Sequence, residues 1–149
     1  MQTLSRPAQR ATIAARGASR RNVHLLARRS QAPRDQLLLD ALLEDRPHAW
    51  TRFLSRFDDL IEATIRRWTG GRWRPLSEDD RGDIRSIFLE SLLADDRRKL
   101  RAYEPAFGVE VTTWIALLVK RCACDYVRAA QARVRAGKRA LRDRLFDQH

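Results

Sequence analysis

The sequence contains few of the residues on which disulfide-bonded, metal-binding and turn-rich β proteins depend. Its 149 residues include 2 cysteines, 6 glycines, 5 prolines and 3 histidines. Cys122 and Cys124 lie two positions apart in a helical pattern, so their side chains diverge, and no second pair accompanies them as a zinc site requires. Scarce glycine and proline argue against a sandwich or barrel. We therefore expect a protein of the reducing cytoplasm, with no disulfide, metal or other cofactor.

Long hydrophobic runs and catalytic motifs are also missing. No apolar run approaches the length that spans a membrane, and no glycine-rich phosphate loop occurs. The acid pairs Asp58-Asp59 and Asp95-Asp96 have no partnered histidine or nucleophile. Neighbouring acids on a helix diverge, so these pairs indicate solvated helix ends. The sequence predicts no enzyme, no membrane partner and no small-molecule substrate.

The charge is strongly positive but unevenly distributed. The formal net charge is +11; residues 1–34 contain eight arginines and no acid, whereas residues 35–149 hold 22 basic and 19 acidic residues. Residues 1–34 also show little apolar periodicity, which predicts a disordered basic tail. We divide the rest into a helical domain over residues 35–130 and a basic C-terminal helical tail over residues 131–149. Because the tail holds most of the excess charge, a nucleic-acid partner must be argued from one face of the domain.

From residue 35 onward, apolar residues recur at spacings of three and four, which predicts a compact all-α domain of four to five helices. A short leucine-rich helix over 37–43 is followed by a helix that Asp45 caps and whose apolar stripe runs from Trp50 to Trp68. Gly70-Gly71 ends that helix, and the basic loop Arg72-Trp73-Arg74-Pro75 follows.

Ser77 is a good N-cap for a third helix, with acids in its first turn. We expect this helix to break at 94–96 and to be followed by a loop over 103–108. Its predicted core face consists of Ile84, Ile87, Phe88, Ser91 and Leu92.

The last helix has two chemically different faces. It begins near Thr112 or Thr113, runs through Arg128 and can continue to Phe146, with a bend expected at Gly137. Its core face carries Ile115, Leu118, Val119, Cys122 and Tyr126, and the opposite face carries Trp114, Leu117, Lys120, Arg121, Cys124 and Arg128. An exposed tryptophan beside three cations suits nucleic acid, because cations neutralise phosphates and an indole ring stacks on an unpaired base. The alternative is an ordinary solvated basic face with one half-buried tryptophan.

Three short segments also stand in a characteristic order: Tyr103-Glu104-Pro105, Thr113-Trp114-Ile115 and Asp125-Tyr126-Val127-Arg128. They are similar to the F-D-P, [ST]-W-L and D-Y-L-R landmarks of region 2 of the sigma-70 family of RNA polymerase sigma factors. With Leu42 through Trp68 similar to the first conserved helices and Asp79 through Leu89 to the polymerase-docking helix, residues 37–130 resemble region 2 of the extracytoplasmic-function type.

The resemblance implies a transcription initiation protein that melts promoter DNA and captures the non-template strand of the −10 element. In that family the loop before the [ST]-W-L helix cradles a flipped base. Tyr103 and Phe107 are then stacking candidates, unless they cover the core beneath the loop. Arg121 replaces a family asparagine, which favours phosphate contact over base readout. The implied DNA-binding residues are Tyr103, Phe107, Thr112, Thr113, Trp114, Lys120, Arg121 and Arg128.

The second partner that the resemblance implies is the pair of clamp helices of core RNA polymerase. The family's docking helix commonly carries D-L-x-Q-E, whereas this chain has Gly82-Asp83-Ile84-Arg85-Ser86, so a face that meets basic helices has gained a cation. Asp79, Asp80 and Asp83 compensate in part. The implied polymerase-binding residues are Asp80, Arg85, Ser86, Phe88, Leu89 and Leu92.

Sigma factors of this type also have a C-terminal helix-turn-helix domain, and the 21 residues after Arg128 are too few for one. Either that domain was lost or truncated, or the protein works as a lone region 2. Two other functions stay open. One is a degenerate sigma-like protein that acts through a protein partner such as an anti-sigma factor. The other is a non-specific basic nucleic-acid binder.

Overall fold

A computed structural model describes residues 31–70 and 76–147 of the chain. The predicted basic loop at 72–75 and residues 1–30 of the predicted tail lie outside the described residues. The described parts contain helices and no strand, which confirms the all-α prediction. The elements are a helix over 31–43, α2 (Ala49–Thr69), α3 (Glu78–Arg101), the short 3₁₀ helix η1 (Pro105–Phe107) and α4 (Val111–Phe146).

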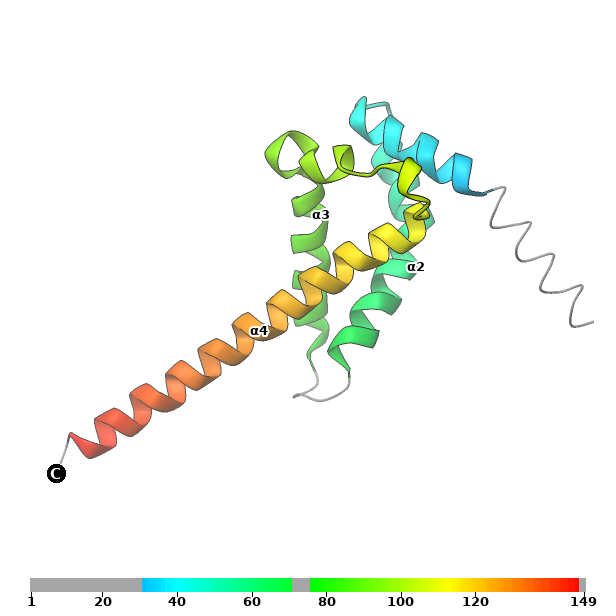
Figure 1. Cartoon of the computed structure of the whole chain (residues 1–149). Coiled ribbons are helices and arrows are strands. Elements are labelled where there is room, and N and C mark those ends of the chain that lie inside the picture. Colours follow the sequence, from blue (N-terminus) through cyan, green and yellow to red (C-terminus); the bar gives the residue numbers. More distant parts are fainter. Residues whose placement is uncertain (1–30, 71–75, 148–149) are drawn as a thin grey trace, which may run out of the picture.

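The arrangement is a pair of antiparallel helices crossed by a third. Figure 1 shows α2 and α3 side by side, with α4 running diagonally across both. The helix over 31–43 lies at the end of the pair where α2 begins and α3 ends (Figure 1). The second half of α4 continues well beyond the other helices (Figure 1). No helix among the described residues is both long and apolar enough to cross a membrane.

The core lies where these three helices meet. Phe53 and Phe57 of α2 are fully buried and pack with their ring centroids 5.0 Å apart. α3 contributes Ile84, Phe88 and Leu92, and α4 contributes one residue per turn: Val111, Ile115, Val119 and Ala123. Burying a large apolar side chain contributes roughly 1.5–3 kcal/mol each. The spacing of four along every helix is the pattern that the sequence predicts for core faces.

α3 begins and breaks where the sequence predicts. The Ser77 hydroxyl accepts from the Asp80 backbone N–H, and the Asp80 carboxylate accepts from the Ser77 N–H at 2.9 Å, a complete capping box. At Ala94 the helix loses helical geometry, and three successive residues, Asp95 to Arg97, have positive φ. Left-handed backbone costs L-residues roughly 1–2 kcal/mol each, so other contacts must hold this turn.

Arg97 supplies those contacts. Its guanidinium donates to the Leu43 carbonyl at 3.0 Å and to the Asp45 carboxylate, which ties the break in α3 to the loop before α2. Asp45 is therefore not the cap of α2 that its position suggested. The N-cap is His48, which makes no side-chain capping bond.

Four further expectations are corrected. Residues 31–34, expected in the tail, are helical. Ile87 and Trp68, expected in the core, are 44% and 43% exposed. α4 continues through Gly137 in helical conformation, without the expected bend (Figure 1). Ile87 and Trp68 follow core spacing, but the neighbouring helices leave them partly uncovered, whereas Gly137 stays helical without tertiary support from the described residues.

The two helical glycines Gly82 and Gly137 provide a matched test of which part of the molecule is held by tertiary packing. A Cβ added at either would meet nothing within 4 Å. We expect Gly82→Ala to raise the free energy of unfolding by about 0.5–1 kcal/mol, because alanine loses less backbone freedom on folding. Gly137→Ala should raise it less, since an unpacked helix end frays without unfolding the domain. Urea denaturation followed by tryptophan fluorescence measures both; an equal gain at Gly137 would contradict this picture.

Candidate nucleic-acid interface

The outward face of α4 is the surface that the sequence singled out. Ile115 and Val119 are buried, and Leu118, Cys122 and Tyr126 pack partly buried against the core. On the other side, Thr113, Leu117, Arg121 and Arg128 are exposed. The predicted core face is thus buried or partly buried, whereas the predicted opposite face is mixed: Leu117, Arg121 and Arg128 are exposed, and Trp114, Lys120 and Cys124 are partly buried.

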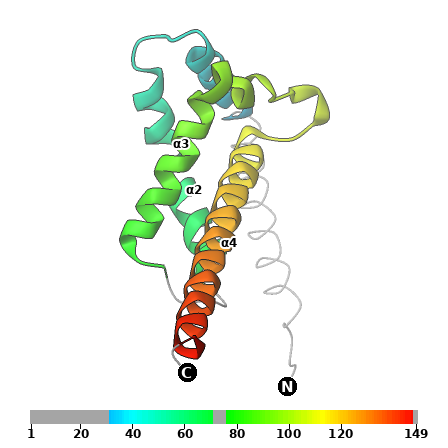
Figure 2. The ribbon, with the colours of Figure 1, turned by 90° about the vertical axis from the view of Figure 1, so that its left-hand side faces the viewer.

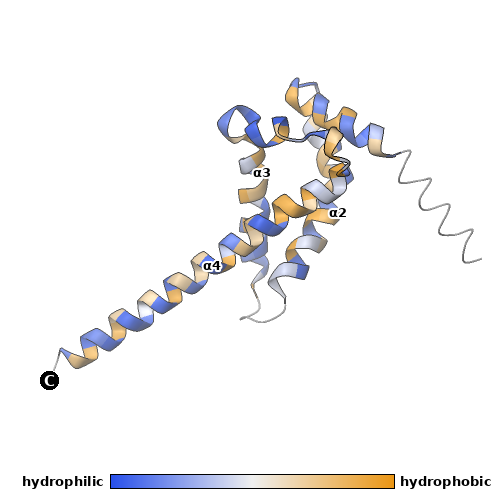
Figure 3. Ribbon diagram, in the orientation of Figure 1, coloured by the Kyte–Doolittle hydropathy of each residue, from blue (hydrophilic) through white to orange (hydrophobic). Residues whose placement is uncertain are grey.

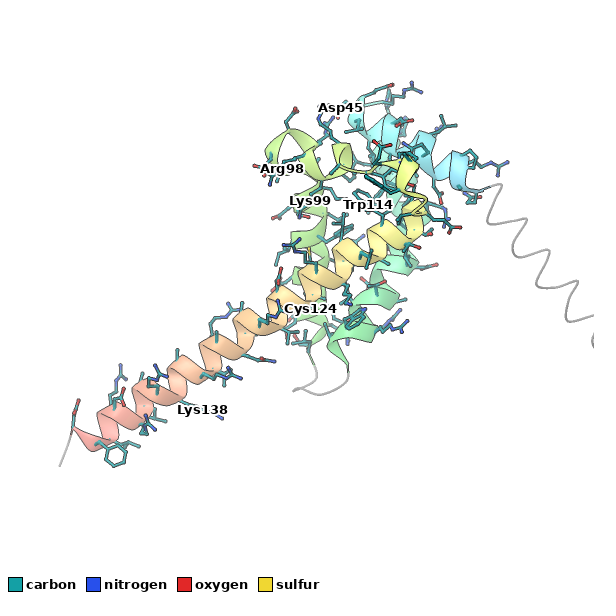
Figure 4. The ribbon with its side chains drawn as sticks, viewed as in Figure 1. Asp45, Arg98, Lys99, Trp114, Cys124 and Lys138 are labelled. Atoms are coloured by element: carbon teal, nitrogen blue, oxygen red, sulfur yellow. The ribbon has the colours of Figure 1, made fainter. Side chains whose placement is uncertain are left out.

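Trp114 differs from the expected exposed platform. It is half-buried, and its ring centroid lies 5.2 Å from that of Tyr103. The Tyr103 hydroxyl donates to the Val109 carbonyl at 2.7 Å, and burial raises the pKa of Tyr103 above its ordinary value. These two rings brace the segment that leads into α4, and Figure 4 shows Trp114 at that end of the helix. Of the open interpretations of Tyr103, the covering of the core is the one its contacts favour.

Phe107 is the exposed aromatic ring of the same segment. It ends η1, and 81% of its surface is exposed. The Glu104 carboxylate accepts from the Ala106 N–H at 3.3 Å, and Gly108 turns the chain with a φ of 70°, where a side chain would be strained. Figure 2 shows this segment standing out from the body of the molecule at the N-terminal end of α4. An apolar ring held outward in this way is available to a ligand.

Trp68 is a member of this surface that sequence reasoning missed. The Lys120 ammonium lies 4.0 Å from the centre of the Trp68 ring, a cation–π contact between α4 and the end of α2. In the sequence, Trp68 follows Ile61 and Ile65 at core spacing. The spacing alone therefore predicts a core residue. The exposure of Trp68 depends instead on where α4 crosses α2, which the sequence pattern does not show.

The remaining polar residues of the predicted DNA face have weak internal partners. Arg128 pairs with Asp125 at 3.2 Å, with side chains 77% and 59% exposed, and such a pair contributes little. The Thr112 hydroxyl donates to the Glu110 carboxylate at 3.4 Å. Arg121 is exposed, as is Thr113. The cations of this face are thus available to an anionic ligand.

Beside Thr112 and Thr113, a hollow of about 450 Å³ opens between α4, α2 and the helix over 31–43. Its charged groups are Glu110 and the pair of Asp35 and Arg56, whose two hydrogen bonds are both 2.9 Å long. Asp35 is 3% exposed, so this pair joins the first described helix to α2 from within. Among the residues that the structure describes, no three histidine, cysteine or acidic side chains gather as a metal site requires.

On α3, two of the predicted polymerase-binding residues are corrected. Phe88 and Leu92 are fully buried, so neither can touch a partner, and they position the helix instead. Ser86 is exposed and Leu89 half-buried. The apolar surface that the sequence did not identify on α3 consists of Ile87 and Leu93, which are 44% and 49% exposed.

The cation that α3 gained is neutralised within the domain. The Arg85 guanidinium donates to the Asp58 carboxylate at 2.7 and 2.9 Å and lies 3.9 Å from Glu62, both on α2. Arg85 is therefore a bridge between α2 and α3. The positive charge of Arg85 would therefore repel basic clamp helices less than the sequence suggests, because the Asp58 and Glu62 carboxylates offset it.

Asp80 also has an internal function. The Tyr126 hydroxyl of α4 lies 2.8 Å from the Asp80 carboxylate and 3.2 Å from that of Asp83. The hydrogen bond to Asp80 is the main cause that raises the pKa of Tyr126 to about 12, followed by burial. The tyrosine of the D-Y-L-R-like segment thus fixes α4 to the first turns of α3.

Comparison with protein-family models, with curated proteins and with solved structures finds no significant match for this chain. The functional conclusion therefore rests on the motifs and on the surfaces described above.

Tyr126 gives a test with a defined pH window. Its pKa is raised from 10.0 to about 12, so its contribution to stability is complete below pH 10 and lost as the pH rises toward 12. We expect Tyr126→Phe to unfold at lower urea concentration than the wild type near neutral pH, and the difference to shrink across that window. A difference that stays constant with pH would show that the hydroxyl has no such linkage.

Proposed function

We propose that residues 37–130 form a sigma region 2-like domain that binds core RNA polymerase and captures the non-template strand of the −10 promoter element. The observation that carries the proposal is the combination of the exposed Phe107 with the cationic outward face of α4, a helix that only three residues separate from η1. In the sigma-70 family the corresponding segments cradle the flipped base and contact its strand. Two of the three motif segments, residues 103–105 and 113–115, lie at the N-terminal end of α4, and the third, residues 125–128, lies further along the same helix.

The chemistry of the surface supports single-stranded DNA as the ligand. Lys120, Arg121 and Arg128 can neutralise backbone phosphates. Phe107 offers an exposed ring for an unpaired base, and stacking contributes about 1–3 kcal/mol per base. Extruding a base costs a few kcal/mol, so one or two such contacts are enough to offset it.

The outer surface of α3 supports polymerase docking in a modified form. With Arg85 paired to Asp58, the groups facing outward include Glu90 between the exposed Ile87 and Leu93. An acidic and apolar surface is complementary to basic helices. Asp80 and the buried Phe88 and Leu92 then act by holding α3 in place.

Single-stranded DNA binding is the first test. Arg121→Ala and Arg128→Ala should each lower the log–log salt slope of binding by about 0.7, the value for one phosphate contact on a single strand. Phe107→Ala should cost about 1–3 kcal/mol with little change in slope, because it removes stacking and no charge. Fluorescence anisotropy on a −10-like strand and a scrambled strand, over a range of salt concentrations, measures both quantities.

Arg52→Ala is the matched control, since Arg52 is an exposed arginine beside the helix over 31–43, on a different surface of the domain. It should leave both affinity and slope unchanged. Equal affinity for both strands with an unchanged Phe107→Ala variant would favour the non-specific binder. No DNA binding at all would favour the sigma-like protein that acts through a protein partner.

Polymerase docking is tested on α3. We expect Ile87→Ser combined with Leu93→Ser to weaken binding to core RNA polymerase by about tenfold or more, because each serine removes an exposed apolar side chain from the proposed surface. Leu37→Ser is the control, since Leu37 is 65% exposed on another helix. Co-purification and surface plasmon resonance with core polymerase measure the effect; binding that survives the double change would remove α3 from the interface.

A further inference from the structure

The second half of α4 has no tertiary partner among the described residues. Residues 132–146, called the arm here, are all exposed and extend away from the domain (Figure 1). The arm contains six basic residues and one acid, Asp143. It nevertheless exposes three aliphatic residues, Val134, Leu141 and Leu145, at 54%, 60% and 61%, and the aromatic Phe146 at 75%. Large apolar side chains on a helix that is otherwise highly charged need an explanation.

These aliphatic residues form one line along the arm. Spacings of seven and four bring Val134, Leu141 and Leu145 within about 20° of a common direction on an α-helix. Figure 3 shows hydrophilic and hydrophobic residues alternating along this part of α4. Arginines border the line on both sides: Arg133 and Arg144 on one, Arg135 and Arg142 on the other, and a further cation, Lys138, lies within about 40° of the line between Val134 and Leu141. This is the layout of a helix-pairing seam with charged flanking positions.

We propose that the arm is a docking helix for an acidic amphipathic α-helix of a protein partner. The narrow line of branched aliphatic residues fits the seam of a second helix, and the four bordering arginines fit carboxylates at its flanking positions. A second copy of the chain does not fit, because two arms would bring their arginines together. Residues 1–30 do not fit either, since they contain seven arginines and no acid.

Two other ligand classes match the arm less well. A helix that lies on a membrane surface presents a broad apolar face, whereas the three aliphatic residues span only about 40° and Phe146, at the end of the arm, lies roughly 120° away from them. Nucleic acid would use the cations but gives no reason for a straight row of aliphatic residues between them. The proposal is independent of sigma-like activity, because no residue of the arm belongs to the DNA or polymerase surfaces described above.

The test uses the full-length protein and a designed helical peptide with leucine at its seam positions and glutamate at its flanks. We expect fluorescence anisotropy to detect binding of this peptide and little binding of the same peptide with lysine flanks. Leu141→Ser combined with Leu145→Ser should weaken binding at least about tenfold without changing any charge. The matched control is Ala132→Ser with Ala136→Ser, on the opposite side of the arm, which introduces the same residue and should bind as the wild type.

Two results would overturn the proposal. One is equal binding of the glutamate and lysine peptides, or peptide binding that is insensitive to the Leu141 and Leu145 changes. The other is a ligand of another class whose binding depends on the line of aliphatic residues. Phosphatidylserine-containing vesicles and duplex DNA test for such a ligand. If the serine changes abolish binding to either of those and spare the acidic peptide, the arm is a membrane or nucleic-acid element instead.

Discussion

The packing of one row of α4 side chains onto α2 and α3 is the constraint on which the rest of the structure depends. Val111, Ile115, Val119 and Ala123 are all buried, so α4 can neither rotate nor slide without uncovering apolar surface. This row decides which residues face outward. Arg121 and Arg128 are exposed because they stand opposite it, and the direction of the arm follows from the same helix.

Polar contacts around this row set the finer geometry. Tyr126 fixes α4 to the start of α3 through Asp80, while Arg85 fixes α3 to α2 through Asp58. Arg97 holds the left-handed turn of α3 against the loop that precedes α2. In each case the residue looks from the sequence like surface charge or part of a binding motif, and in the structure it joins two elements. A charged residue in a family-like position is therefore not by itself a contact to a partner.

The sequence predicts the helices and their inner faces well, because core burial repeats every three or four residues. It fails where the outcome depends on how helices cross. Ile87 and Trp68 have core spacing, yet the neighbouring helices leave them 44% and 43% exposed, and Trp68 meets the Lys120 side chain of α4 in a cation–π contact. Trp114 lies on the charged side of α4 and is half-buried, because Tyr103 folds back onto it. The family resemblance singles out Phe107 as a stacking candidate, but its 81% exposure depends on the turn at Gly108. Such contacts link residues of different elements, and periodicity within one helix cannot report them.

The two halves of α4 are stabilised differently: the first half packs against the domain, and the arm is exposed. An isolated helix of this length is marginal in water, because the first turn fixes several residues for a single hydrogen bond. Here the packed part of α4 supplies that first turn, and the arm extends it with alanine and arginine, which are good helix formers. The arm therefore adopts a helix at a small cost in conformational free energy, although no described residue outside α4 packs against it. A helix that is already formed loses little further backbone freedom on binding, which leaves more of the contact energy for affinity. The same core row that orients the outward face of α4 thus also prepares the arm for a partner.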